Sequence, residues 1–202
     1  MPAFQDHPDN PAPAATAPAP ATATRLPRGP LTSLRRYTPE DAAEFTARAR
    51  ESRALHHPWL SPPTSEEAYA VYAARLRQSP DREGFLVGEH AAGGAIAGFV
   101  NINNIVLGAF RCGALGYGAF AHAAGRGVMS EAIGLVLEYA FGPLGLHRLE
   151  ANVQPANARS IALVRRAGFR LEGFSPDFLR IDGAWRDHER WAITAEMLAQ
   201  RE

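Results

Sequence analysis

The chain has 202 residues, of which 46% are hydrophobic, so it can form one medium-sized domain with a buried core. Its 21 basic residues balance 21 acidic ones, which excludes a global field that would attract nucleic acid or an anionic membrane. All basic residues are arginine, which excludes lysine chemistry, and the single cysteine, Cys112, excludes an internal disulfide and argues against a cysteine-rich metal site.

The composition also bears on location and domain limits. A lone cysteine is typical of a reducing compartment, and we expect a cytoplasmic protein. No stretch approaches the roughly 18 consecutive apolar residues of a membrane-spanning helix. Residues 1–30 hold half of the 16 prolines, mixed with alanine and threonine. Because such a stretch has little to bury, we expect a disordered tail at 1–30 and a folded domain at 31–202.

The N-terminal half of the domain predicts a strand, two helices and an antiparallel hairpin. Thr38-Pro39-Glu40-Asp41 has the capping hydroxyl, early proline and acidic residues of a helix start. Prolines in 58–63 stop helix continuation. The expected elements are a strand at 31–37, a helix at 38–55, a loop at 56–63, a helix at 65–77, and strands at 85–87 and 95–103 joined through Gly93-Gly94.

Two features of this half are candidates for substrate contact. The loop with His56, His57 and Trp59 has no cysteine or acid at ligand spacing, so we expect no metal there; it forms either a cleft wall or ordinary packing. Asn101 and Asn103 share one face of their strand, and buried amides need partners. Those partners are a peptide-like ligand or the neighbouring loop.

Residues 115–141 predict a strand, a glycine turn and a long helix. Ala124-Gly125-Arg126-Gly127 forms the turn, so the N–H groups of residues 125–130 precede the helix ladder and face outward at the positive end of its dipole. Glycine lets an anion approach the backbone, and Arg126 and Ser130 can add side-chain donors. The alternative is an ordinary strand-to-helix turn. Core-facing positions are Val128, Met129, Ala132, Ile133, Val136, Leu137 and Ala140, with Glu131 and Glu138 opposite.

The C-terminal part predicts one more helix among strands. A strand at 147–153 follows the long helix and should pair in parallel with the strand before the turn, by the right-handed crossover rule. The remaining expected elements are a helix at 158–167 capped by Asn157 and stopped by Gly168, and strands at 169–171, 178–181 and 185–194, the last two joined by Asp182-Gly183.

This order of elements resembles the GNAT acetyltransferases. His122-Ala-Ala-Gly-Arg-Gly127 stands in the place of the family's Gln/Arg-x-x-Gly-x-Gly/Ala pyrophosphate loop, with His122 as a departure from Gln or Arg. Asn157-Ala-Arg-Ser160, followed by Gly168-Phe169, is similar to the Asn-x-x-Ser…Gly-Phe signature of the branch that acetylates ribosomal proteins. The resemblance covers residues 31–195, and the stretches 55–59, 101–110 and 181–188 also support it.

The resemblance implies an α+β fold and a cofactor. We expect a central twisted mixed sheet of six to seven strands flanked by helices, splayed between the strand ending near Phe120 and the strand at 147–153. Acetyl-CoA is the implied co-substrate, with no metal. Its expected contacts are Phe120, Ala121, His122, Gly125, Arg126, Gly127, Val128, Met129, Ser130, Asn152, Asn157 and Ser160.

Acyl transfer needs an oxyanion donor and a proton for the departing thiolate. A backbone N–H near Tyr117 to Ala119 is the expected oxyanion donor, and Gly116 and Gly118 would form a bulge that aims it. By resemblance, Ser160 would protonate the thiolate. The alternative for Ser160 is a first-turn serine that bonds its own backbone.

The sequence indicates less clearly which group removes the proton from the amine. Asp177 is the candidate base, with Glu172 behind it, although a surface carboxylate is the alternative for both. An α-amine is partly neutral at pH 7, so water could carry the proton instead. Cys112 could form an acetyl-enzyme or be a buried apolar side chain.

The expected function is acetyl transfer to the N-terminal α-amine of a protein, such as an alanine-starting small-subunit ribosomal protein. The alternatives are a small amine, such as an antibiotic or polyamine, as acceptor, and a non-catalytic acyl-CoA-binding or ribosome-assembly module. We expect no direct contact with nucleic acid or membrane, and a monomer or homodimer. Expected substrate contacts are Trp59, Asn101, Asn103, Tyr117 and Trp185.

Overall fold

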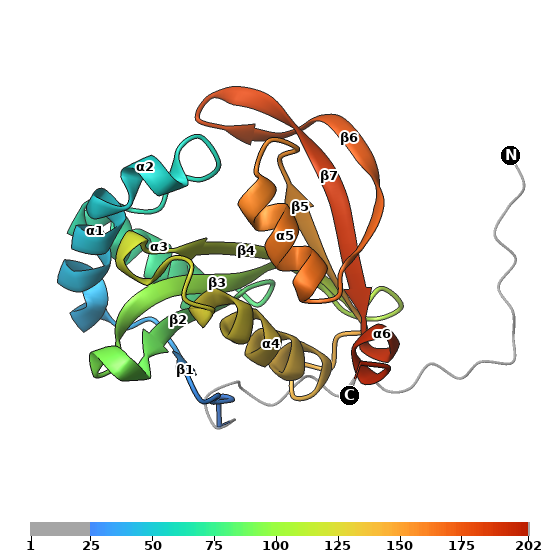
Figure 1. The fold of residues 1–202 in the computed structure, drawn as a ribbon, viewed down its shortest axis with the longest axis horizontal. Helices are drawn as coiled ribbons and strands as arrows, with labels where there is room; N and C mark the ends of the chain where they lie inside the picture. The colour runs from blue at the N-terminus through green and yellow to red at the C-terminus, as the bar shows by residue number, and fades with distance from the viewer. Residues whose placement is uncertain (1–24, 202) are drawn as a thin grey trace, which may run out of the picture.

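The computed structural model describes residues 25–201, which fold around a single mixed sheet (Figure 1). Its seven strands run in the order β1-β2-β3-β4-β5-β7-β6, and all neighbours are antiparallel except β4 and β5. The parallel pair is joined by a crossover through α4, as the sequence predicted. The strands are β1 (Thr32–Arg35), β2 (Glu83–Glu89), β3 (Ala95–Val106), β4 (Cys112–Ala119), β5 (Arg148–Val153), β6 (Arg170–Ile181) and β7 (Ala184–Thr194).

Helices cover both faces of the sheet, which confirms the predicted α+β fold. α4 and α5 lie on one face, and α1 and α3 pack against the other (Figure 1). No helix among residues 25–201 is long and apolar enough to span a membrane. The helices are η1 (Pro39–Asp41), α1 (Ala42–Glu51), α2 (Arg53–His56), α3 (Glu66–Gln78), η2 (His90–Ala92), η3 (Ala121–Ala123), α4 (Val128–Phe141), α5 (Ala158–Arg166) and α6 (Ala195–Ala199).

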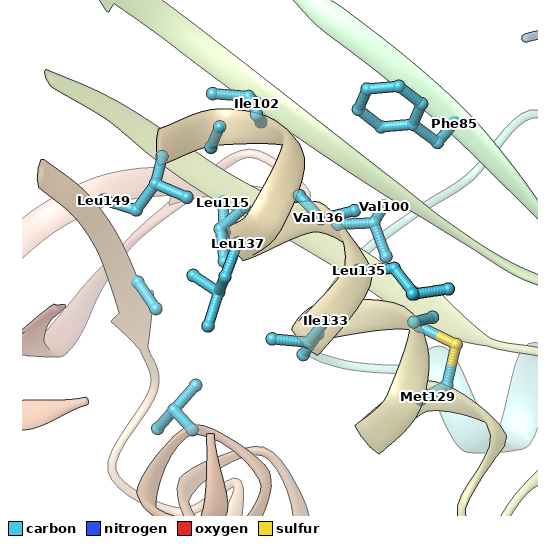
Figure 2. Close-up of a cluster of buried hydrophobic side chains, with 14 of the residues drawn as sticks. Phe85, Val100, Ile102, Leu115, Met129, Ile133, Leu135, Val136, Leu137 and Leu149 are labelled. Carbon is cyan, nitrogen blue, oxygen red and sulfur yellow. The ribbon is translucent and has the colours of Figure 1, made fainter. Parts of the chain in front are cut away.

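The larger part of the core lies between α4 and the sheet (Figure 2). All seven core-facing positions that the helical spacing predicted are buried. Leu135 and Tyr139 are buried as well, and the Tyr139 hydroxyl accepts a hydrogen bond from Arg36 at 3.0 Å. The opposite face carries an aromatic cluster in which Phe45, Phe99 and Phe120 pack with ring centroids 5.3–6.1 Å apart. Each face of the sheet is thus packed against helices through a hydrophobic cluster.

The sheet opens in the middle. β4 and β5 pair only from Cys112 to Leu115 on one strand and from Arg148 to Ala151 on the other. Beyond these residues the strands separate, so residues 116–119 of β4 have β3 on one side and no strand on the other. This is the predicted splay.

Three local expectations differ from the structure. The helix expected at 38–55 breaks at Ser52, whose buried hydroxyl accepts from the Ala121 N–H at 2.8 Å. The strands expected at 169–171 and 178–181 form one strand, β6, with two register shifts against β7. The bulge expected at Gly116 and Gly118 is wrong, because β3 and β4 pair in regular register there. A Cβ at Gly118 would instead lie 2.7 Å from the Phe99 ring, so packing requires glycine.

The first described residues are tied to the domain. Of the tail expected at 1–30, residues 1–24 lie outside the described residues, but Leu26 packs on the core and Arg28 forms an isolated β-bridge with Ser33. Glu131 of α4 accepts hydrogen bonds from the N–H groups of Leu31 and Thr32 at 2.9 and 2.7 Å. Ordered structure therefore begins before residue 31.

Candidate active site

A cleft of about 1610 Å³ runs through the opening between β4 and β5. Its walls come from the α2–α3 loop, the start of α4, the start of α5 and the β6–β7 hairpin, which surround the opening in Figure 1. The loop reaches across to the hairpin, where the Ser61 hydroxyl lies 2.7 Å from Asp182 Oδ1, and to β5, where Gln154 Nε2 lies 3.5 Å from the Trp59 carbonyl. The two halves of the sheet are therefore bridged over the cleft.

The glycine loop, residues 124–127, brings free backbone N–H groups to one end of the cleft. Gly125 and Gly127 have φ of +80° and +83°, and a Cβ built on Gly125 would meet nothing within 4 Å. The Glu131 N–H is bonded to the Gly127 carbonyl at 3.1 Å, so the N–H groups of residues 128–130 precede the hydrogen-bond ladder of α4. These donors and the helix dipole form an anion-binding site.

The edge of β4 offers a second set of backbone groups. The Phe120 N–H donates to the Ala97 carbonyl of β3, and main-chain groups alternate in direction along a strand. Tyr117 and Ala119 therefore direct their N–H and carbonyl groups toward the opening. The Ala119 carbonyl accepts from His56 Nε2 at 2.8 Å. The groups that remain can pair with an extended ligand in the manner of a strand.

Ser160 and Tyr117 meet beside this edge. The Tyr117 and Ser160 hydroxyl oxygens are 2.5 Å apart, and the Ser160 N–H donates to Asn157 Oδ1 at 3.1 Å, which caps α5 as predicted. Burial raises the pKa of Tyr117 to about 12, so the phenol keeps its proton at neutral pH. The Ser160 hydroxyl bonds a side chain across the opening and not its own helix, so it is presented to the cleft as one member of a hydroxyl pair.

The opposite face of the sheet contributes a different group of side chains. Leu149, Ala151 and Trp191 point into the core below α4 and α5, so the alternate residues Glu150 and His188 point to the other face. Both line the cleft. The two oxygens of Glu150 accept from Arg148 at 3.1 Å and from Arg190 at 2.9 Å. Glu150 is the only carboxylate among the described residues that line the cleft, and it is already paired.

Comparison with known proteins identifies the family. The family model described as "Acetyltransferase (GNAT) domain" matches residues 32–170. The chain belongs to the GNAT acetyltransferase family. It is 41% identical over 99 residues to the [ribosomal protein uS5]-alanine N-acetyltransferase of Escherichia coli, covering 49% of this chain and 51% of that protein. It is 40% identical over 98 residues to the probable N-acetyltransferase YjcK of Bacillus subtilis, covering 48% and 54%. The chain thus spans about half the length of the curated relatives it matches.

Solved structures agree with the GNAT fold. Mycobacterium smegmatis RimJ in complex with CoA-disulfide superposes with a TM-score of 0.76 at 29% identity, covering 83% of each chain. The spermidine N-acetyltransferase of Vibrio cholerae in complex with CoA and spermine gives 0.72 at 20% identity, covering 85% of this chain and 99% of that one, and at this identity it shows the fold alone.

Most residues predicted from the GNAT resemblance line the cleft. Those present are Trp59, Asn103, Tyr117, Gly125, Gly127, Met129, Ser130, Asn152, Asn157 and Ser160. Asn152 has a buried Oδ1 without a partner among the described residues, which suits a ligand that donates a hydrogen bond. Asn103 Oδ1 also accepts from Arg82 at 3.1 Å.

Several predicted contacts lie elsewhere. Phe120 is fully buried, its N–H is bonded to Ala97, and the Ala121 N–H is bonded to Ser52, so the free edge lies at Tyr117 and Ala119 and not at 120–122. Asn101 lies outside the cleft and is bonded by Tyr37 and Tyr72, the partners that its buried amide required. The other predicted residues whose side chains do not line the cleft are Ala121, His122, Arg126, Val128, Asp177 and Trp185.

The reasons for these positions are physical. The Arg126 guanidinium pairs with buried Glu89 at 2.5 Å, which leaves its backbone and not its side chain for the anion site. Asp177 is exposed in β6, and Glu172 is bonded by Arg148 and Arg170, which lower the pKa of its carboxyl to about 2. Burial raises the pKa of the Cys112 thiol, which makes it a weak nucleophile.

Sequence reasoning missed the position of Glu150 in the cleft wall and the contact of Ser52 with the Ala121 N–H. His188 lies in the segment 185–188, which the sequence also suggested as part of the cleft; it lines the cleft, but the sequence assigned it no chemical role. Glu150 and Ser52 could not be found, because their positions depend on strand pairing and on a helix break. Among residues 25–201 no group of three or more potential metal ligands occurs.

Proposed function

We propose that this protein transfers the acetyl group of acetyl-CoA to the N-terminal α-amine of a protein. The observation that carries this proposal is the meeting, in one cleft, of the anion-binding start of α4, the free edge of β4 and the Ser160–Tyr117 pair. A cofactor with a diphosphate at one end, an amide-bearing arm and a thioester at the other end needs these three features in this order. The uS5-alanine N-acetyltransferase relative and the CoA-bound RimJ structure support the same conclusion.

The residues fit acetyl-CoA on structural grounds. Gly125 leaves open space where a side chain would block the backbone, and the N–H groups of residues 128–130 would hold the diphosphate. The exposed groups of Tyr117 and Ala119, and Asn152 Oδ1, would pair with the amides of the arm. When bound, acetyl-CoA supplies the acetyl group as a thioester.

The chain's own groups provide the chemistry. An N–H of Tyr117 or Ala119 faces the opening and is the donor for the carbonyl oxygen as it gains charge. The Ser160 hydroxyl donates a proton to the sulfur, and the Tyr117 hydroxyl, 2.5 Å away, replaces it. The acceptor amine would enter from the opposite face of the sheet, where Glu150 and His188 line the cleft.

The charges of that face favour a peptide over a polyamine. A polyamine carries several positive charges and calls for unpaired carboxylates. The one carboxylate among the described lining residues, Glu150, already accepts from two arginines. A single amine on a chain that can pair with backbone and amide groups fits this face better. We place the reaction in the cytoplasm, and a ribosomal protein beginning with alanine is the proposed acceptor.

An acceptor comparison tests the proposal. Thiol release from acetyl-CoA would be measured with an alanine-starting peptide, the same peptide with a blocked N-terminus, a blocked lysine-bearing peptide and spermidine. We expect release with the free alanine peptide and little with its blocked form, because only the first presents an α-amine. Faster release with spermidine would show that the acceptor is a polyamine and not a protein α-amine. Absence of release with every acceptor, despite measurable CoA binding, would indicate a binding module.

A further inference from the structure

His188 is a buried histidine of the cleft wall that the chemistry described so far leaves unused. It is 3% exposed, it lies on β7, and it faces the side of the sheet opposite to α4 and α5. Its ring packs against Phe178, with centroids 5.9 Å apart. A titratable ring at this position faces the half of the cleft from which the acceptor amine would enter.

The hydrogen bond of His188 determines which ring nitrogen holds the proton. Nδ1 lies 2.9 Å from the carbonyl oxygen of Arg186. A carbonyl can only accept, so Nδ1 carries the hydrogen and Nε2 has a free lone pair. The Nδ1 contact is the one side-chain hydrogen bond of His188 to the described residues. His188 is therefore fixed in the tautomer that can accept a proton at Nε2.

The other buried or half-buried basic groups of the cleft are already engaged, and His57 is exposed in the α2–α3 loop. Glu150 accepts from Arg148 and Arg190, and the Cys112 thiol is protonated. His56 shows the reverse of the His188 arrangement: its Nε2 carries the hydrogen that bonds the Ala119 carbonyl, and its Nδ1 is buried without a partner. The Nδ1 lone pair of His56 is thus buried, whereas the ring of His188 lies at the cleft wall.

We propose that His188 is the general base that removes the proton from the acceptor amine, a role that rests on the proposed function above. Nε2 takes one proton from the bound ammonium, which frees the nitrogen lone pair to attack the thioester carbon. As the carbon–nitrogen bond forms and the carbon–sulfur bond breaks, the nitrogen releases its second proton to water, and the thiolate takes a proton from Ser160. Water then removes the His188 proton and returns one to the Ser160–Tyr117 pair, so an ammonium and a thioester yield an amide, a thiol and one proton. Acid and base lie on opposite faces of the sheet and do not exchange protons directly.

The surroundings of the ring favour this role. Asp187 is adjacent on β7, and Arg190 lies two residues along the same face with its guanidinium 4.4 Å from the Phe178 ring centroid. β6 contributes that uncharged ring, and β5 contributes Glu150 paired with Arg190. The α2–α3 loop contributes His57 and Trp59 to the cleft. Burial lowers the pKa of His188 below its usual value, so the ring is neutral and able to accept a proton at pH 7.

A conservative substitution tests the proposal. His188→Asn keeps an N–H that can reach the Arg186 carbonyl but has no imidazole lone pair. With the alanine-starting peptide we expect kcat to fall by about 10²-fold at pH 7, the scale of a lost general base, with unchanged CoA affinity. The deficit should shrink as pH rises, because more of the amine is then neutral. The matched control is His90→Asn, since His90 Nδ1 is also bonded to a carbonyl, that of Pro30, but lies outside the cleft.

Two further measurements keep the proposal falsifiable if the asparagine variant folds poorly. The wild-type kcat at saturating peptide should fall below a pH midpoint under that of free histidine, about 6.5. His188→Ala should regain activity with added imidazole. A His188→Asn loss of less than about threefold, or a loss equal at every pH without imidazole rescue, would overturn the base role. If the wild type binds CoA but acetylates no amine, it is the proposed function that fails, and not this assignment alone.

Discussion

Two contacts hold Ser160 at the start of α5. Its N–H donates to the capping Asn157, and its hydroxyl lies 2.5 Å from that of Tyr117 on β4. The hydroxyl is thereby held at the side of the strand where the backbone is free. Because burial keeps Tyr117 protonated, the pair can pass a proton toward the cleft without an external acid.

Removing either hydroxyl should therefore slow turnover without loosening CoA. We expect Ser160→Ala to lower kcat by about 10²-fold and Tyr117→Phe to lower it less, since Ser160 remains as the direct donor. The loss in the double variant should be smaller than the product of the single losses, because the hydroxyls act as a unit. Thiol release and calorimetric CoA titration measure both quantities. Ser79→Ala, outside the cleft, is the control, and an unaltered rate in Ser160→Ala would remove the proton-donor role.

At the scale of elements, α4 combines two functions. Its core-facing residues pack the helix against the sheet (Figure 2). Its N-terminus presents backbone donors behind the glycine loop. The position of the anion site is therefore set by the packing of α4 on the core. The ion pair between Arg126 and Glu89 and the contacts of Glu131 with β1 fix both the loop and the first turn.

The geometry of the glycine loop predicts that a substitution at Gly125 lowers the affinity for CoA. Gly125→Ala would strain a residue at φ +80° by about 1–2 kcal/mol and place a methyl group in the space that the diphosphate needs. We expect CoA affinity to fall by about tenfold or more. Gly108→Ala, at φ +69° with equally open surroundings, carries a similar strain in the β3–β4 connection and should leave CoA affinity unchanged. Equal losses in both variants would show that general destabilisation is the cause.

At the scale of the whole molecule, the sheet is two sub-sheets joined by a short parallel pairing. The opening beyond Leu115 and Ala151 gives access from both faces. One core cluster packs against both sub-sheets, and the α2–α3 loop bridges them at Ser61 and Trp59. A ligand in the opening would take the place of the missing strand neighbour.

That arrangement predicts an alternating protection pattern. CoA should slow amide hydrogen exchange of Tyr117 and Ala119 by about tenfold or more, because their N–H groups face the opening. Gly118 should change little, since its N–H is directed to β3. Residue-resolved exchange by NMR with and without CoA measures this. Uniform protection of residues 117–119, or none, would contradict the predicted binding mode.

Local patterns were sufficient for much of the fold. The seven buried positions of α4, the Asp182-Gly183 turn and the parallel crossover follow from helical spacing, turn chemistry and chain handedness. Errors arose where a distant partner decides the outcome. Ser52 breaks a helix to bond Ala121, and Gly118 is glycine because Phe99 lies against it. Neither partner is near in sequence, so no local pattern records the contact.

By itself the sequence determined the element order, the glycine loop with its free N–H groups, and the Asn157–Ser160 pair, because each depends on neighbours within a few residues. Only the tertiary structure decided which polar groups remain free. Packing across the sheet engages Asn101, Glu150 and Arg126, and it leaves Tyr117, Asn152 and His188 at the cleft. The residue type determines which hydrogen bonds a side chain can form. Whether those bonds are formed within the protein depends on partners that folding brings from elsewhere in the chain.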